Sequence, residues 1–147
     1  MIKSIIFDYG HTLLDNENSR LFDNAERILE QLDQKGVILC LVSGTNKEEF
    51  RMQQLYDFGI FPYFKYIKFI PHWDKKDFQP VLKEFDLKPN EVLVVGDRLT
   101  SEITEGKKLG LKTCRVLRGP EKDYIPENDF EKPDYTVENI SEVIHLL

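Results

Sequence analysis

The sequence is poor in cysteine and has no surplus of positive charge. The chain contains two cysteines, Cys40 and Cys114, and each lies in an apolar stretch. Disulfide frameworks belong to oxidising compartments, so we expect two buried thiols and the reducing conditions of the cytoplasm. Twenty lysines and arginines are outnumbered by 26 aspartates and glutamates, which gives a net charge of −6. Nucleic acid is not an expected partner, because a phosphate backbone is bound by clustered positive charge.

Long hydrophobic runs are also absent. No apolar segment approaches the ~18 residues that cross a bilayer, and the N-terminus lacks the charged, apolar and small-residue succession of a secretory signal. We therefore expect a soluble cytoplasmic protein with no membrane partner. A chain of 147 residues has the length of one domain with a substantial core. We expect residues 1–147 to form that single domain.

Short apolar runs alternate with amphipathic stretches along the chain. Runs of this length with few polar breaks are typical of strands buried on both faces of a sheet. A repeated strand–helix order predicts right-handed crossovers and a doubly wound, Rossmann-like parallel sheet in three α/β/α layers. The predicted strands are residues 2–7, 37–42, 66–70, 92–95 and 113–117.

Five helices are expected between and after these strands. The first spans residues 21–32, where apolar side chains recur at helical spacing, and Gly36 closes it in the left-handed conformation. The second opens with the capping-box spacing of Thr45 and Glu48. The third takes Asp77 as its cap, since Pro80 then lies in the first turn. A fourth helix is predicted after Thr100–Ser101 and a fifth over residues 140–147.

Polar residues follow the predicted strands at the points where they end. In a doubly wound sheet, ligands bind beside the carboxyl ends of the strands. Ser43, Gly44 and Thr45 at a helix start offer backbone N–H groups and hydroxyls to a small anion. The other clusters at this edge are Asp8 after the first strand, Lys75–Lys76 after the third, and Gly96–Asp97 with Glu102 after the fourth.

Three carboxylates are expected to meet in this crevice. Asp8, Asp97 and Glu102 would crowd negative charge there, and a like pair ~4 Å apart costs about 4 kcal/mol at an effective dielectric near 20. A hard divalent cation relieves that cost. Oxygen ligands that are few in number and face an anion site favour Mg²⁺, which keeps several waters and contacts a phosphate.

These clusters carry a family resemblance that covers nearly the whole chain. Residues 5–13, Ile-Ile-Phe-Asp-x-Gly-x-Thr-Leu in outline, resemble the first motif of the haloacid dehalogenase superfamily, whose usual form is Asp-x-Asp-Gly-Thr. Val42–Ser43 is similar to the second motif, and residues 94–103 resemble the fourth, in which Gly-Asp precedes a second acid. Residues 106–113 and 133–136 are also similar to that family.

The resemblance implies a Mg²⁺-dependent phosphohydrolase that works through an aspartyl-phosphate. It implies that Asp8 attacks phosphorus as the nucleophile and that Ser43 hydrogen-bonds a transferring oxygen. Lys75 is expected to neutralise the charge that develops there, with Lys76 nearly as good a candidate. Ser43, Gly44, Lys75 and Lys76 are the expected phosphate-binding residues.

The resemblance also implies the metal ligands. Mg²⁺ would be held by the carboxylates of Asp8 and Asp97 and by the backbone carbonyl of Gly10, with Glu102 bound directly or through water. An acid in the first turn of a helix is stabilised by the helix dipole without any metal, so a purely structural role for Glu102 stays open.

The first motif departs from the family pattern at Gly10. The family has an aspartate there, which protonates the leaving group and then activates water, and such help is worth 10²–10⁴-fold. His11 can move a proton near neutral pH, but neighbouring side chains in an extended stretch point in opposite directions. We expect a slow phosphatase or one restricted to good leaving groups. The alternative is a catalytically impaired protein of this fold that binds metal, phosphate or a partner protein.

The intervals from Asp8 to Ser43 and from Ser43 to Lys75 are too short for the cap domain that many family members carry. An uncapped site is open. The resemblance therefore implies either a phosphoprotein substrate or a phosphorylated small molecule, the latter enclosed by oligomerisation, and both a monomer and a homo-oligomer stay open. The acidic residues 121–133 are expected to form a solvated surface loop, with a mobile flap near the site as the alternative.

Overall fold

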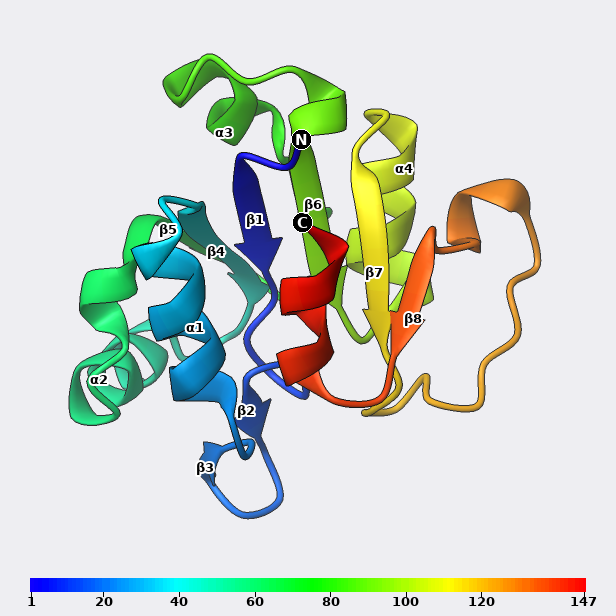
Figure 1. Cartoon of the computed structure of the whole chain (residues 1–147). Helices are drawn as coiled ribbons and strands as arrows, with labels where there is room; N and C mark the ends of the chain where they lie inside the picture. The colour runs from blue at the N-terminus through cyan, green and yellow to red at the C-terminus, as the bar shows by residue number, and fades with distance from the viewer.

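The computed structural model describes residues 1–147 and shows a six-stranded, wholly parallel sheet flanked by helices (Figure 1). The strand order is β5-β4-β1-β6-β7-β8, with β1 and β6 at the centre. This arrangement confirms the predicted doubly wound sheet. The strands are β1 (Ser4–Phe7), β4 (Ile38–Gly44), β5 (Phe64–Ile70), β6 (Val92–Gly96), β7 (Lys112–Val116) and β8 (Tyr135–Val137).

The strand β8 is the one member of this sheet that hydrophobic pattern did not predict. Only one of its three residues, Val137, is buried, so no apolar run marks it. It pairs in parallel with β7 at the edge of the sheet. A second, two-stranded antiparallel sheet, also unpredicted, joins β2 (Leu14–Asp15) to β3 (Arg20–Leu21) directly after β1.

The helices match the predicted positions more closely than the predicted boundaries. Thr45 does not open the second helix: its hydroxyl accepts a hydrogen bond from the Lys47 amide in the loop before it. Asp77 is not the cap of the third helix, because Phe78 occupies that position, although the Asp77 carboxylate accepts a hydrogen bond from the Gln79 amide. Pro80 lies in the first turn, as expected. The α-helices are α1 (Ala25–Gln34), α2 (Glu48–Asp57), α3 (Gln79–Glu84) and α4 (Thr104–Lys108), and Gly36 follows α1 at φ 81°.

Shorter helical turns complete the layers. A π-helical segment, η3 (Leu99–Ile103), leads directly into α4, so the predicted fourth helix begins with an irregular turn. The predicted fifth helix is a 3-10 segment, η5 (Ile140–Leu146). The remaining 3-10 turns are η1 (Phe61–Tyr63), η2 (Pro89–Glu91) and η4 (Asp129–Glu131).

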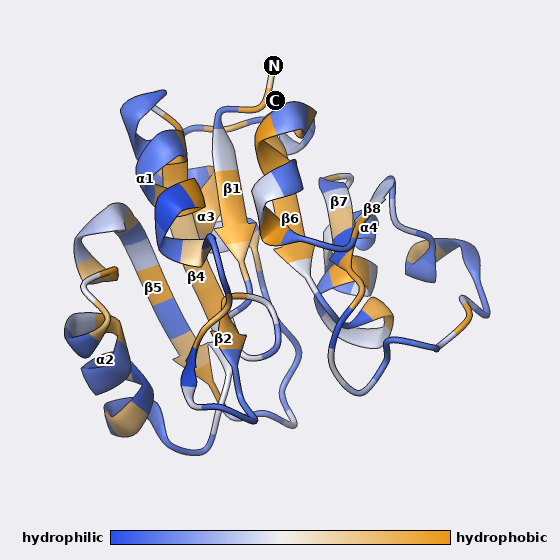
Figure 2. Ribbon diagram, turned by 60° about the horizontal axis from the view of Figure 1, so that its bottom comes forward, coloured by the Kyte–Doolittle hydropathy of each residue, from blue (hydrophilic) through white to orange (hydrophobic).

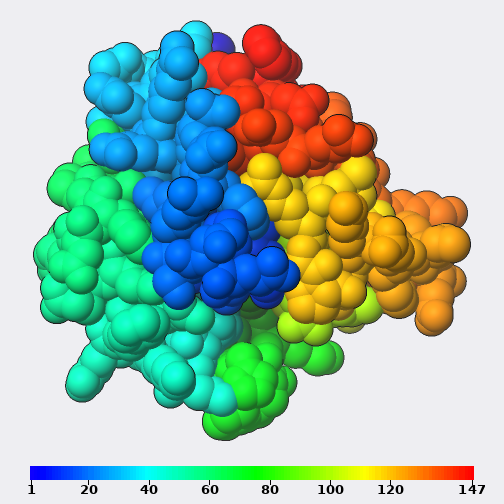
Figure 3. Space-filling view, turned by 90° about the horizontal axis from the view of Figure 1, so that it is seen from below, coloured from blue at the N-terminus to red at the C-terminus, as the bar shows by residue number.

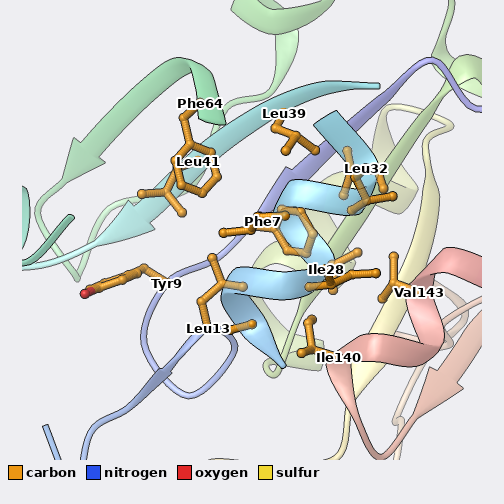
Figure 4. Close-up of a cluster of buried hydrophobic side chains, with 14 of the residues drawn as sticks. Phe7, Tyr9, Leu13, Ile28, Leu32, Leu39, Leu41, Phe64, Ile140 and Val143 are labelled. Carbon is orange, nitrogen blue, oxygen red and sulfur yellow. The ribbon is translucent and has the colours of Figure 1, made fainter. Parts of the chain in front are cut away.

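The central strands β1, β4 and β6 are mostly apolar, as their position between two helical layers requires (Figure 2). Alternate residues of β1 serve different layers. Ile5 and Phe7 belong to a large cluster with α1 and η5, where Phe7 lies near Ile28 and Leu32 (Figure 4). Ile6 belongs to a smaller cluster on the other face, with residues of α3 such as Val81. Burial of both faces fixes the register of β1, because a shift of one residue would exchange the two sets.

The long segment between β7 and β8 is organised by internal hydrogen bonds. The buried guanidinium of Arg115 donates to the backbone carbonyls of Glu121, Lys122 and Tyr124. At its far end, the Glu131 carboxylate accepts from the Tyr124 hydroxyl and the Glu127 amide. The segment is a surface loop held by two buried side chains, those of Arg115 and Glu131.

No helix in the structure has both the length and the apolar character needed to cross a membrane.

One aspartate ties β8 to the rest of the sheet, and its loss should destabilise the fold. Asp134 accepts hydrogen bonds from the amide and hydroxyl of Thr113 on β7 and pairs with Lys107 on α4 at 2.9 Å. We expect Asp134→Asn to lower the free energy of unfolding by about 1–3 kcal/mol at pH 7 in urea titrations. The exposed Asp129, which pairs only with Lys132, provides the control: Asp129→Asn should cost less than about 0.5 kcal/mol.

The same variant tests a pH dependence. Burial alone would raise the pKa of Asp134, but the hydrogen bonds from Lys107 and Thr113 hold it below its ordinary value. A carboxylate with a lowered folded-state pKa stabilises the protein above its unfolded-state pKa, near 4, and this stability is lost as the pH falls through the folded-state value. The difference between wild type and Asp134→Asn should therefore shrink between pH 5 and pH 3. An unchanged difference would contradict this assignment.

Candidate functional site

The carboxyl ends of three adjacent strands bring the first predicted site residues together. Phe7 on β1 is in register with Leu41 on β4 and Val95 on β6. The residues at the carboxyl ends of these strands therefore lie side by side, on the side of the molecule that Figure 3 shows. A cavity of about 220 Å³ lies there. Its lining is almost wholly polar and consists of Asp8, Tyr9, Gly10, His11, Asn16, Ser43, Gly44, Arg51, His72, Asp74, Lys76, Asp97, Arg98, Ser101 and Pro120.

Asp8 occupies the buried centre of this cavity. Its backbone amide donates to the Val95 carbonyl, which fixes the start of the loop after β1. Its Oδ1 accepts hydrogen bonds of 2.9 Å from the Ser43 hydroxyl and from the Lys76 ammonium. Burial alone would raise the pKa of Asp8, yet Lys76 and the hydrogen bonds lower it below its ordinary value. Asp8 is thus held as a carboxylate, the form that a nucleophile needs.

The structure distinguishes between the two candidate lysines and corrects the choice of Lys75. Lys75 is exposed and does not line the cavity. Lys76 is buried, and its Nζ lies 2.9 Å from both Asp8 Oδ1 and Glu102 Oε1. Burial alone would lower the pKa of Lys76, but the two carboxylates raise it, so the ammonium stays charged. Lys76 is therefore the cation that can face a phosphoryl group at Asp8.

Asp8, Asp97 and Glu102 form one buried acidic cluster, as their places after the strands predict. One carboxylate oxygen from each lies within 4.8 Å of the others. Burial, with the negative charges of Asp8 and Glu102, raises the pKa of Asp97 to about 9. Asp97 Oδ2 is buried without a hydrogen-bond partner, while Oδ1 accepts a long bond of 3.4 Å from Thr12. A buried, unpartnered carboxylate oxygen beside two other acids fits the oxygen donor set of a divalent metal ion.

Glu102 contributes to this cluster differently from Asp8 and Asp97. One of its oxygens accepts from Lys76 and the other accepts from the Arg98 amide at 2.9 Å. A side chain at Gly96 would collide with the Glu102 carboxylate, so the glycine before Asp97 makes room for it. Glu102 therefore links Lys76 to the backbone at Arg98.

The backbone around Gly10 and His11 is shaped by the β2–β3 hairpin. Asn16, from the turn of that hairpin, accepts a hydrogen bond from the His11 amide at 2.9 Å. His11 has φ 60°, a left-handed conformation that glycine adopts most easily. The first motif of the family usually has a glycine at this position. A Cβ added to Gly10 would meet no atom closer than 3.4 Å, the distance to the Asn16 side chain. The backbone at position 10 therefore leaves space for a Cβ atom.

Several cavity residues carry no sequence signal that predicts their place in the site. Asn16 reaches the cavity because the hairpin folds back. Arg51 lies on the second turn of α2 and looks like an ordinary solvated charge in the sequence. Arg98 is paired with Glu121, a residue of the loop after β7. Each depends on chain segments that meet only in the folded protein. Gly44, which was predicted, does line the cavity.

The fold and these motifs agree with a known family. Residues 1–116 match the model of the haloacid dehalogenase-like hydrolases, and the chain belongs to that family. No narrower identity follows from this match, which covers the segment from β1 through β7.

Individual relatives give the same family at lower coverage. The protein YfnB of Bacillus subtilis, named as a HAD-hydrolase, is 28% identical over 140 residues, 89% of this chain and 56% of YfnB. Its structure, described as bound to magnesium, superposes with a TM-score of 0.71 over 87% of this chain and 56% of that one. A glyceraldehyde 3-phosphate phosphatase of Methanocaldococcus jannaschii is 38% identical over 66 residues, 45% of this chain and 28% of the enzyme.

A third likeness concerns the fold alone. A HAD-superfamily hydrolase of Geobacter sulfurreducens has a TM-score of 0.77 at 16% identity, and the superposition covers 100% of both chains. The chain spans about half the length, or less, of the curated relatives it matches.

Lys76 should be essential to the stability of the acidic cluster. Lys76→Met would leave Asp8 and Glu102 buried without their shared cation, and such a loss costs about 3–5 kcal/mol. The exposed neighbour provides a matched control, since Lys75→Met should change stability by less than about 0.5 kcal/mol. Urea unfolding of both variants in a buffer with a chelator would measure the difference. Equal stabilities would show that Lys76 does not neutralise the cluster.

Proposed function

We propose that this chain is a Mg²⁺-dependent phosphohydrolase that acts through an aspartyl-phosphate. The observation that carries the proposal is the buried Asp8 carboxylate, which contacts Ser43 and Lys76 at 2.9 Å in a polar cavity beside Asp97. A carboxylate, a hydroxyl and a cation around one point are what phosphoryl transfer requires of a protein, because its catalysis is mainly positioning and charge stabilisation. The phosphatase named among the relatives supports the same chemistry.

The proposed reaction has two displacements. An Asp8 oxygen forms a bond to phosphorus as the bond to the ester oxygen breaks, which releases the alcohol and leaves an aspartyl-phosphate. Water then attacks phosphorus, releases inorganic phosphate and restores the Asp8 carboxylate. Ser43 donates to a phosphoryl oxygen, and Lys76, oriented by Glu102, offsets the negative charge on the transferring group.

Asp8, Asp97 and the Gly10 carbonyl are the proposed ligands of Mg²⁺, with Glu102 acting through water. Bound there, the ion would polarise the phosphoryl group and shield it from the charge of Asp8. The unpartnered Asp97 oxygen supports this ligand set. Mg²⁺ binding would also favour the ionised form of Asp97, whose pKa the cluster otherwise raises.

Proton transfer is the proposed weak step. The departing alcohol must acquire a proton, and Gly10 offers no side chain to supply it. We therefore propose slow turnover, or turnover restricted to esters with good leaving groups. The competing proposal is a member of this fold that binds metal, phosphate or a protein partner without turnover. Gly10 is the observation that favours this alternative.

A phosphorylated small molecule is the substrate class that the relatives support, because one of them is named as a glyceraldehyde 3-phosphate phosphatase. The cavity beside Asp8 has a volume of about 220 Å³. Its lining is polar, which suits a compact, charged metabolite.

An assay with p-nitrophenyl phosphate tests the proposal, because this ester has a good leaving group that needs little protonation. We expect hydrolysis that requires Mg²⁺ and falls by several orders of magnitude in Asp8→Asn. Asp33→Asn, an exposed change on α1, should retain full activity. Absence of activity in the wild type, or activity unchanged by Asp8→Asn, would exclude the proposed mechanism.

A gain-of-function variant tests the role of Gly10. A Cβ at position 10 would meet no atom closer than 3.4 Å, so the first side-chain atom of Gly10→Asp can be accommodated. If the missing proton donor is the only defect, kcat for an ester with a poor leaving group should rise by about 10²–10⁴-fold. Gly10→Asn is nearly isosteric but cannot transfer a proton, so it should give no such gain. Equal rates in both variants would show that the site is limited in some other way.

A further inference from the structure

One cation of the cavity has no acidic partner. Lys76 is paired with Asp8 and Glu102, and Arg98 is paired with Glu121. Arg51, on α2, lines the same cavity as Asp8 but belongs to none of the ion pairs of the protein. Its side chain is half-buried and so stays accessible from the cavity. An arginine placed like this has charge to offer to a ligand.

Arg51 is also held in position. Its Nη1 donates to the Gln54 side-chain oxygen at 2.9 Å, and the Tyr9 hydroxyl donates to that same oxygen at 3.1 Å. Gln54 and Tyr9 are buried. The guanidinium carbon lies 5.9 Å from the centre of the Tyr9 ring and 5.6 Å from that of the Phe50 ring. A side chain fixed in this way loses little further freedom on binding a ligand.

Arg51 and the proposed nucleophile Asp8 line the same cavity, although no hydrogen bond or ion pair joins their side chains. Only one N–H of the guanidinium is used by Gln54, which leaves the others for a second acceptor. A planar guanidinium binds a carboxylate through two parallel hydrogen bonds.

We infer that Arg51 forms a subsite for a carboxylate on the substrate, so that the preferred substrates are small phosphomonoesters of hydroxy acids. This inference rests on the proposed function and adds the substrate class. Both anionic groups can belong to one compact molecule, since Arg51 and Asp8 line a single cavity of about 220 Å³. In this inference the phosphoryl group contacts Asp8, Ser43 and Lys76, and the carboxylate contacts Arg51.

A matched pair of esters isolates this contact. Phosphoglycolate and ethyl phosphate have backbones of the same length and differ in the carboxylate. We expect the wild type to have a higher kcat/KM for phosphoglycolate. Arg51→Gln should lower that value about tenfold or more, the scale of a charged hydrogen bond, and change the value for ethyl phosphate less than about threefold. Arg51→Lys should restore part of the preference, and Arg27→Gln, an exposed change on α1, should leave both values unchanged.

Binding provides a readout that does not depend on turnover. Calorimetric titration of both esters into Asp8→Asn, with and without Arg51→Gln, should show that Arg51 strengthens binding of phosphoglycolate alone. If the wild type hydrolyses no ester but binding still depends on Arg51, the proposed function fails and the subsite stands. If Arg51→Gln weakens the binding of both esters equally, or if the wild type binds both esters with the same affinity, the subsite is excluded. This holds whether or not the protein hydrolyses either ester.

Discussion

The buried lysine at the carboxyl edge of the sheet is the interaction on which the rest of the site depends. Asp8, Asp97 and Glu102 bring carboxylate oxygens within 4.8 Å of one another, and their repulsion grows as water is excluded. Lys76 lies between two of these acids, with only 6% of its side chain exposed. It offsets part of the negative charge, and the raised pKa of Asp97 accounts for another part. A divalent cation would complete the balance by accepting the unpartnered oxygen of Asp97.

Sheet topology explains why residues so distant in sequence meet at this lysine. β1 lies between β4 and β6, so the three strands deliver Asp8, Ser43 and Asp97 to adjacent positions. Lys76 lies in the loop before α3, and Glu102 lies in η3, the turn that leads into α4. Each of these three strands contributes apolar residues to both core clusters. The free energy of burying them offsets the repulsion between the carboxylates at the carboxyl ends of the strands.

Features set by local pattern could be predicted from the sequence, and features set by tertiary contact could not. The buried strands were predictable because both faces must be apolar, and the acids at their ends follow from the parallel order. β8 was not, since it is short and only Val137 is buried. The sequence also does not separate Lys75 from Lys76, because adjacent loop residues differ only in the direction of the side chain. That direction depends on the path from β5 to α3. Arg51 depends in the same way on a contact with Gln54 and Tyr9.

Gly10 affects one stage of the proposed reaction and leaves the others intact. The proposed contacts to a substrate come from Ser43, Lys76 and Arg51, and the hydrogen bonds that position these residues do not involve Gly10. The proposed metal contact of Gly10 uses its backbone carbonyl and so does not depend on a side chain there. A lost proton donor acts only in the transition state, so it lowers kcat and leaves substrate binding unchanged. The expected enzyme therefore binds its substrate normally and turns it over slowly, whereas a distorted site would lose affinity as well as rate.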